Sequence, residues 1–303
     1  MQTKQLTVSL VLSLICAYAS ADVMPFLGKA QQFAVLGAQS VTNTNATTLH
    51  GNVGVAPGSS ITGTDNITFA SGGVVRSAAV AMQAQANAAA AYERLAALTG
   101  AIDLSGQDLG SVGTLTPGIY RFSSSAALTG TLTLNFANDP GGIFIFQIGS
   151  TLSTAANSLV HVINGTSSNG LYFQVGSSAT LGEGTAFAGN VLARQSVTFG
   201  SASSIVCGRA VALAGAVTMT GNTVSNDCNA YSPSLAGDYG SMGYSGFGIA
   251  ALPQGEVPEP ATLALFTLGF CTLAWHLPGR RFRIDRGTAT SCPTRSQSIS
   301  MLA

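Results

Sequence analysis

Residues 170–225 read GLYFQVGSSATLGEGTAFAGNVLARQSVTFGSASSIVCGRAVALAGAVTMTGNTVS, and this stretch decides the fold class. Three times in it, hydroxyl side chains stand on both sides of an apolar residue: Ser178 and Thr180, Ser196 and Thr198, Thr218 and Thr220. Because successive strand side chains point to opposite faces, each unit buries its apolar residue and turns a hydroxyl pair outward. The units begin at residues 178, 196 and 217. A period of about 20 residues with glycines between the units is typical of stacked β-solenoid coils.

The same unit occurs earlier in the chain, before a stretch with a different pattern. Residues 40–42 and 60–62 read SVT and SIT, twenty residues apart. Residues 74–99 are then rich in alanine, contain no Gly or Pro and stop at Gly100, which predicts a helix over about 74–99. We expect it to lie beside the coils through a small-residue face: Ala78, Met82, Ala86, Ala89, Tyr92 (or Glu93) and Ala96.

Strand patterns resume after this helix. LTGTLTLNF places Thr129, Thr131 and Thr133 on one face, and Thr151 and Ser153 open a later unit. The almost wholly apolar GGIFIFQIG, residues 141–149, is expected to be covered on both faces, on one side by the helix.

Composition excludes several classes of function. Only 8% of the 303 residues are charged, against about 25% in a typical soluble domain, and the formal net charge is zero. No basic surface for nucleic acid is expected. His50 and His161 stand among scattered carboxylates, and no metal-ligand spacing, nucleophile elbow or phosphate loop occurs. We therefore predict that the protein is not an enzyme and uses no cofactor or metal.

Both ends of the chain have the pattern of targeting segments. Lys4, the apolar run over residues 6–19 and Ala19-Ser20-Ala21 predict a signal peptide at residues 1–21. Residues 229–256, rich in Gly, Ser and Tyr, are expected to form a linker. At the other end, Pro258, Glu259 and Pro260 precede an apolar run over residues 261–277 and then an arginine cluster.

The segment 257–283 resembles a PEP-CTERM sorting signal. This resemblance implies a Gram-negative bacterium, a sorting protease that recognises the Pro-Glu-Pro tail, and delivery to the cell surface. Residues 261–277 would then enter the membrane only transiently; a permanent membrane anchor is the alternative. Residues 284–303 form an atypical tail, because such signals usually end at the basic cluster.

Two cysteines remain outside these end segments. Cys207 and Cys228 are separated by about one coil, so they could face each other on stacked turns. In an oxidising compartment we expect them to form a disulfide, with two free buried thiols as the alternative.

Over residues 27–226 the order of segments resembles the large microbial ice-binding protein family. The segments that carry the resemblance are LGKAQQFAVLG, HGNVGVAPGSSITG, the Ala-rich helix, TPGIYRF, FIFQIGSTLST and GRAVALAGAVTMTGNTV. The resemblance implies a mainly β fold over residues 22–228. That fold is a right-handed, discontinuous β-solenoid of triangular cross-section with one long helix packed alongside.

In that family one flat solenoid face binds ice, so the resemblance implies ice and ordered water as partners. The candidate ice-binding residues are Thr129, Thr131, Thr133, Thr151, Ser153, Ser178, Thr180, Ser196, Thr198, Thr218 and Thr220. The alternative is a surface adhesin or matrix protein on the same fold, with exopolysaccharide as its partner.

Overall fold

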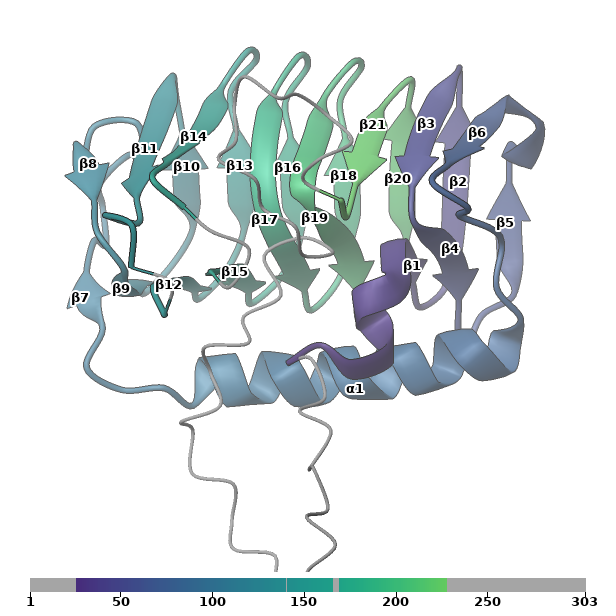
Figure 1. The fold of residues 1–303 in the computed structure, drawn as a ribbon, viewed down its shortest axis with the longest axis horizontal. Helices are drawn as coiled ribbons and strands as arrows, with labels where there is room; N and C mark the ends of the chain where they lie inside the picture. Colours follow the sequence, from purple (N-terminus) through teal and green to yellow (C-terminus); the bar gives the residue numbers. More distant parts are fainter. Residues whose placement is uncertain (1–25, 140, 166–168, 228–303) are drawn as a thin grey trace, which may run out of the picture. The chain divides into compact units, whose positions relative to one another are not determined.

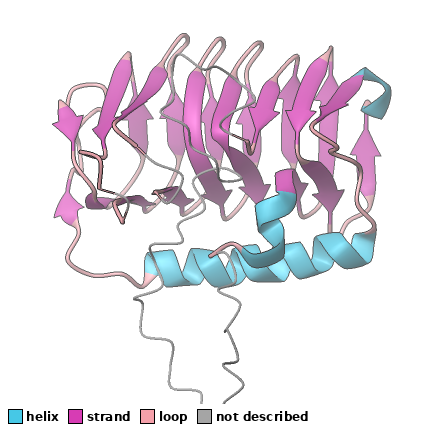
Figure 2. Cartoon of the chain, in the orientation of Figure 1, coloured by secondary structure: helices cyan, strands magenta, loops and turns pink. Residues whose placement is uncertain are grey.

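The computed structural model describes residues 26–139, 141–165 and 169–227. The predicted signal peptide, the linker, the sorting segment, the tail and Cys228 lie outside these residues. Within them the chain is mainly β, with parallel strand pairing throughout and one long helix (Figure 2). No helix of this described part is long and apolar enough to cross a membrane.

The strands form three parallel rows, and the first is a separate seven-stranded sheet that we call the hydroxyl row. Its strands, in spatial order, are β10 (Ala126–Leu128), β13 (Leu152–Thr154), β16 (Ala179–Leu181), β18 (Val197–Phe199), β20 (Val217–Thr220), β2 (Ser40–Thr44) and β5 (Ser60–Thr62). Each pass of the chain adds one strand to this row (Figure 1).

A second row, the helix row, packs against the long helix α1 (Ala78–Ala96), which lies below it in Figure 1. It contains β4 (Asn52–Val55), β1 (Phe33–Gly37), the C-terminal halves of β19 (Ser204–Ala212) and β17 (Ala186–Ala193), β15 (Gly170–Val175), β12 (Ile143–Ile148), β9 (Gly118–Phe122) and β7 (Ile102–Asp103). The short 3-10 helix η1 (Gly28–Gln32) precedes β1.

The third row contains the N-terminal halves of β17 and β19, because both strands bend and belong to two rows. The strand pairing shifts register between Ala188 and Asn190, where Gly189 takes a φ of 95°. The other members are β8 (Thr114–Leu115), β11 (Thr131–Asn135), β14 (Leu159–Ile163), β21 (Thr223–Ser225), β3 (Thr47–His50) and β6 (Ile67–Ala70), with the 3-10 turn η2 (Thr64–Asn66) before β6.

The spatial order of the coils differs from their order in the sequence. The N-terminal strands β1, β2 and β3 pair with β19, β20 and β21 from the end of the described chain. Helix α1 then carries the chain past the other coils to β7 at the far end (Figure 1). Its 19 residues span about 28 Å at 1.5 Å per residue. The interrupted strand pattern in the sequence therefore corresponds to a discontinuous stack.

Helix α1 is shorter than predicted, and it buries a different face. Val74 and Arg76 pair their backbone with Val53, which keeps the predicted first residues out of the helix. The predicted face was wrong apart from Tyr92, and Met82 is 57% exposed. Alanine occurs on every side of this helix, so alanine spacing cannot identify the buried side. The buried residues are Ala81, Ala84, Gln85, Ala88, Ala91, Tyr92 and Leu95.

Apolar packing on both faces of the helix row confirms the prediction for GGIFIFQIG. Phe144 and Phe146 are fully buried in the core inside the coils, whereas Ile145 packs on the other face in the cluster that includes α1. Inside the coils, Phe146 stacks on Tyr120 and on Phe173 from neighbouring strands, with ring centroids 5.4 and 4.7 Å apart. Aromatic pairs of this kind rigidify the core beyond simple burial of area.

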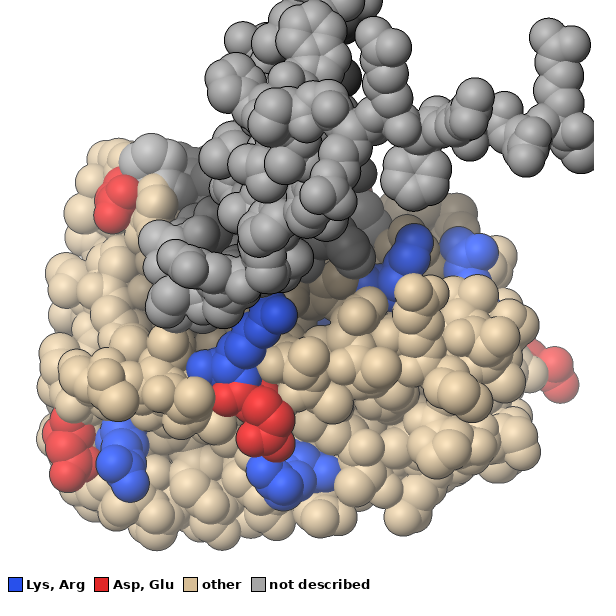
Figure 3. Space-filling view, turned by 90° about the horizontal axis from the view of Figure 1, so that it is seen from below, with Lys and Arg blue, Asp and Glu red and all other residues tan. Residues whose placement is uncertain are grey.

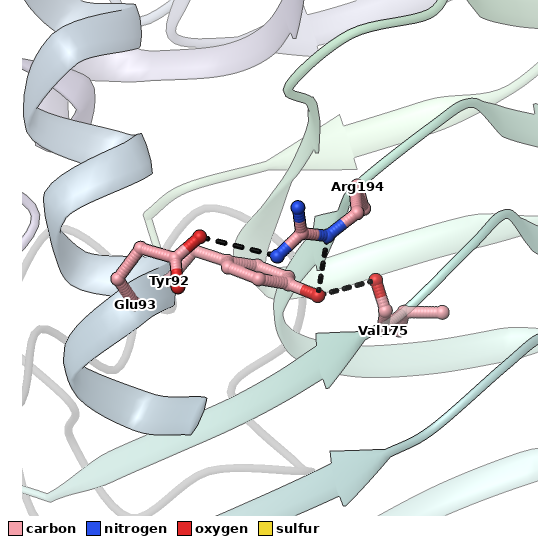
Figure 4. Close-up of polar contacts among 4 residues, drawn as sticks. All are labelled: Tyr92, Glu93, Val175 and Arg194. Atoms are coloured by element: carbon pink, nitrogen blue, oxygen red, sulfur yellow. Dashed lines mark hydrogen bonds and ion pairs between the residues drawn. The ribbon is translucent and has the colours of Figure 1, made fainter. Parts of the chain in front are cut away.

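Polar contacts fix the helix on its row. The amide of Gln147 donates to the carbonyls of Leu95 and Leu98 at the helix end, at 2.7 and 2.9 Å. Figure 4 shows that the Tyr92 hydroxyl donates to the Val175 carbonyl and accepts from Arg194, which also reaches Glu93 at 3.2 Å. Because Arg194 and Glu93 are largely exposed, we expect their ion pair to contribute less than about 1 kcal/mol.

Asp108 attaches the end coil to the last strand of the hydroxyl row. Its Oδ1 accepts from the backbone N–H groups of Gly110 and Thr129, at 2.7 and 2.9 Å. Partial burial alone would raise the pKa of this carboxyl, but the hydrogen bonds lower it below its ordinary value of 3.8. The stabilisation is therefore complete above the unfolded pKa and disappears as the pH falls through the lower folded pKa.

Replacing Asp108 with Ala should therefore lower the free energy of unfolding by about 1–3 kcal/mol at neutral pH. Urea titrations would measure the difference, which should shrink as the pH falls through the lowered pKa of the folded protein. As a control, Asp139→Ala should cost less, because among the described residues Asp139 Oδ1 accepts from the Gly141 N–H alone, in an exposed turn. Equal unfolding free energies for wild type and Asp108→Ala at neutral pH would contradict this role.

Candidate functional site

The hydroxyl row presents one outward side chain at the same position of each strand. The backbone register aligns these central positions in one column: Ala127, Ser153, Thr180, Thr198, Thr218, Thr42 and Thr62. Six of the seven carry a hydroxyl, and all seven are exposed or half-buried. Strand neighbours are about 4.8 Å apart, so the column is a regular line of hydroxyl and methyl groups.

Buried neighbours hold this column in place. Six of the seven central residues lie between two buried side chains, such as Val197 and Phe199 around Thr198, or Ala179 and Leu181 around Thr180. These residues belong to the core cluster inside the coils. A strand whose side chains are packed in the core on both sides of its outward residue has little freedom to rotate, so the backbone under the column is rigid.

A second column precedes the first along each strand, and hydrogen bonds connect its members. The hydroxyl of Thr151 donates to that of Ser125 at 2.8 Å, and the backbone N–H of Ser196 donates to the Ser178 hydroxyl at 3.3 Å. Ser40 aligns with Ser60 at the other end of the row. Two outward residues on one strand are about 6.7 Å apart, so the two columns form a grid.

Charge is absent from this surface. None of the residues in the seven strands of the row is Lys, Arg, Asp or Glu. Charged side chains are visible on the side seen from below, where α1 lies (Figure 3). The sequence of α1 includes Glu93 and Arg94. Among the described residues, no group of three or more His, Cys, Asp or Glu is placed to hold a metal ion.

The structure brings most of the predicted site residues together in the hydroxyl row. Eight of them lie in its strands or directly before them: Thr151, Ser153, Ser178, Thr180, Ser196, Thr198, Thr218 and Thr220.

Three predicted residues have a different placement. Thr131 and Thr133 lie in β11 of the third row, because the chain turns at Gly130, which has a φ of 82°. Thr129 directly follows β10 and is exposed at the end of the hydroxyl row. Alternation alone suggested one continuous strand over these threonines, and that interpretation was wrong.

The candidate ice-binding residues predicted from the sequence do not include the N-terminal part of the grid. Thr42 and Thr62 continue the central column, and Thr44 aligns with Thr220 through a contact of 3.2 Å between their hydroxyl oxygens. The units at residues 40–42 and 60–62 were visible as a pattern in the sequence. Their place beside β20 was not, because it depends on pairing between strands about 175 residues apart.

Cys207 is disulfide-bonded and buried where β19 bends, with a φ of 52°. Its predicted partner, Cys228, lies outside the described residues, so the pairing stays a prediction.

Comparison with known proteins shows which family this chain belongs to. Residues 35–225 match the family described as ice-binding-like. The chain belongs to this family. An ice-binding protein of Nostoc sp. (strain HG1) is 51% identical over 210 residues, covering 69% of this chain and 77% of the relative. Residues 256–281 match the PEP-CTERM protein-sorting motif, in agreement with the predicted sorting segment.

Solved structures of ice-binding proteins share the fold. One from an Antarctic biological consortium is 40% identical, with a TM-score of 0.61 over 66% of this chain and 90% of the other. One from the Antarctic ascomycete Antarctomyces psychrotrophicus is 33% identical, with a TM-score of 0.61 over 66% of this chain and 97% of the other. Both likenesses cover about two thirds of this chain and most of the other chain.

Proposed function

We propose that this protein binds ice, and that the hydroxyl row is the surface that adsorbs to the crystal. The observation that carries the proposal is the central column, in which six strands present a Ser or Thr at the same outward position. The names of the relatives support the same function.

The geometry of the hydroxyl row suits the surface of an ice crystal better than a soluble ligand. Each threonine offers a methyl group, which disfavours bulk-like hydration, and a hydroxyl, which anchors one water molecule. A flat, rigid and uncharged grid holds such waters at fixed spacings, so they can join a growing crystal plane. Many weak contacts on one rigid body act together, which makes attachment effectively irreversible.

Non-catalytic ice binding is favoured over the adhesin alternative, because the named relatives are described as ice-binding proteins. The PEP-CTERM motif supports export and sorting to the cell surface by a protease that cleaves the tail. We further propose that residues 1–21 are a signal peptide, that residues 22–228 form a right-handed solenoid of triangular cross-section, and that Cys207 pairs with Cys228.

Microscopy of single ice crystals tests this function directly. In a solution of the purified protein, crystals should grow with facets, and a gap should open between the melting and freezing temperatures. An equal concentration of a protein without affinity for ice is the control. Round, unshaped crystals at high concentration would refute the proposal.

A further inference from the structure

Threonines also surround the corner between the hydroxyl row and the third row, on three neighbouring coils. These coils are β5–β6, β2–β3 and β20–β21, which pair in this order in both rows. We call the following eight residues the corner array: Thr42, Thr44, Thr48, Thr62, Thr68, Thr218, Thr220 and Thr223.

The backbone register arranges the corner array in three lines. Thr42 aligns with Thr62 and Thr218 in the central column of the hydroxyl row. Thr44 aligns with Thr220 at the end of that row. Around the corner, in the third row, Thr48 aligns with Thr68 and Thr223.

All eight side chains reach the surface. Thr44, Thr62 and Thr68 are exposed, and the other five are half-buried. The Thr44 hydroxyl contacts that of Thr220 at 3.2 Å and also donates to the Met219 carbonyl at 3.3 Å. The hydroxyls of Thr44 and Thr220 are therefore ordered before any ligand arrives.

A buried polar ladder makes the corner rigid from inside. The Thr47 hydroxyl donates to Asn43 Oδ1 at 2.6 Å and accepts from the backbone N–H of Asn222 at 3.0 Å. The amide of Asn43 donates to the Gly63 carbonyl, and that of Asn222 to the Gly200 carbonyl. Four successive coils are thus connected at the corner, which fixes the threonines outside it.

The array is a local feature and not a general property of the strands. Two residues beyond Thr180 and Thr198, at the place that Thr220 occupies in its coil, the chain has Gly182 and Gly200. In the third row, the line of Thr48 and Thr223 continues through Ser204, Ala186 and Leu159 before it reaches Thr131 four strands away, and Ser204 is buried. If threonine merely suited exposed strands, it would recur along the whole line.

The corner is also almost free of charge. In the segments 40–50, 60–70 and 217–225, Asp65 is the one residue among Asp, Glu, Lys and Arg. Asp65 lies in η2 on the outermost of the three coils. The inner two coils therefore present hydroxyl and methyl groups without a charge that would retain a bulk-like hydration shell.

We propose that the corner array is a second ice-adsorbing surface, which extends the site from the hydroxyl row onto the third row. The proposal rests on the proposed function, because the ligand is again ice. The two rows belong to different sides of the coils. A crystal plane that lies flat on Thr180 and Thr198 therefore cannot also lie flat on Thr48 and Thr68. The line in the third row would engage a second plane of different orientation, so the protein should bind two sets of ice planes.

The test is to adsorb fluorescently labelled full-length protein to a single-crystal ice hemisphere and to record which planes become labelled. Wild type should label two sets of planes. The double variant Thr48→Tyr/Thr68→Tyr should lose one set by at least about tenfold, because its line of contacts is interrupted, and should keep the other. The milder Thr48→Val/Thr68→Val, which keeps the shape and loses the hydroxyls, should weaken the same set.

Thr131→Tyr is the matched control. Thr131 occupies the same line of the third row, through Leu159, Ala186, Ser204 and Thr223, but lies four strands away from Thr223. The Thr131→Tyr protein should label both sets of planes as wild type does. Thermal unfolding of each variant shows whether its fold is intact, and the Val variant decides the question if the Tyr variant unfolds.

The two proposals fail in different ways. If both corner variants fold and label the same planes as wild type, the corner array is not a site, and the hydroxyl row stands. If wild type labels one set of planes and Thr48→Val/Thr68→Val leaves it unchanged, the inference is also wrong. If wild type labels no plane at all, the proposed function itself is wrong.

Discussion

Replacing Thr198 with Tyr should abolish adsorption of the hydroxyl row to ice and leave the fold intact. Thr198 lies in the middle of the central column, with Thr180 and Thr218 as its aligned neighbours. A tyrosine ring there would stand above the grid and hold the crystal plane away from the threonines on both sides. Multivalent attachment exceeds that of single contacts by about 10²–10⁴-fold, so the gap between melting and freezing should shrink by at least about tenfold.

The fold should tolerate this change, because Thr198 is exposed and its neighbours Val197 and Phe199 supply the packing. We expect the free energy of unfolding to stay within about 0.5 kcal/mol of wild type. Thr131→Tyr, in the other sheet, is the control and should shape ice normally. Full activity of a folded Thr198→Tyr protein would show that the hydroxyl row is not the main ice-binding surface.

The sequence contains most of the information about the coils and little about their order in space. Hydroxyl–apolar–hydroxyl units predict outward Ser and Thr because strand geometry fixes which side chains share a face, and the structure has Thr180, Thr198 and Thr218 in one column. In contrast, Thr42 pairs with Thr218 because α1 carries the chain to the far end of the stack, and the later coils then build back towards β2. No local sequence pattern encodes this pairing between distant strands.

The corrected predictions have a common physical cause. Thr131 and Thr133 alternate with apolar residues as a continuous strand would, but Gly130 with its positive φ turns the chain onto another row. A glycine in a strand pattern indicates a bend without giving its direction. Alanine spacing in α1 was similarly uninformative, because the small side chain fits both a buried and an exposed helix face.

Arg209 has a role that the sequence gives no reason to expect, because a charged residue is rarely fully buried. It lies in β19 with no exposed surface, and burial lowers the pKa of its guanidinium to about 10, so the group is still charged at neutral pH. Its Nε donates to the Phe33 carbonyl at 3.2 Å, and Nη2 donates to the Gln31 carbonyl at 3.1 Å. Nη1 donates to Asn190, which in turn donates to the Leu171 carbonyl.

These bonds cross the junction between the two ends of the described chain. Phe33 and Gln31 belong to the N-terminal segment, whereas Asn190 and Arg209 belong to β17 and β19. Arg209 therefore attaches the first coil to the last one. The same N-terminal coils carry Thr42 and Thr62 into the hydroxyl row, so the continuity of the central column depends on this junction.

We expect Arg209→Met to lower the free energy of unfolding by about 3–5 kcal/mol, because three buried oxygens lose this donor and each such loss costs about 1–3 kcal/mol. Arg194→Met is the matched control. Arg194 is half-exposed, and its loss should cost less than about 1 kcal/mol.

Hydrogen exchange separates local from global loosening of Arg209→Met: the amides of β1 and β4 should lose protection first, whereas those of β12 and β15 keep theirs. Uniform loss of protection, or none, would contradict a role at the junction. Local loss should also weaken ice shaping, since Thr42 and Thr62 would no longer be held in line with Thr218.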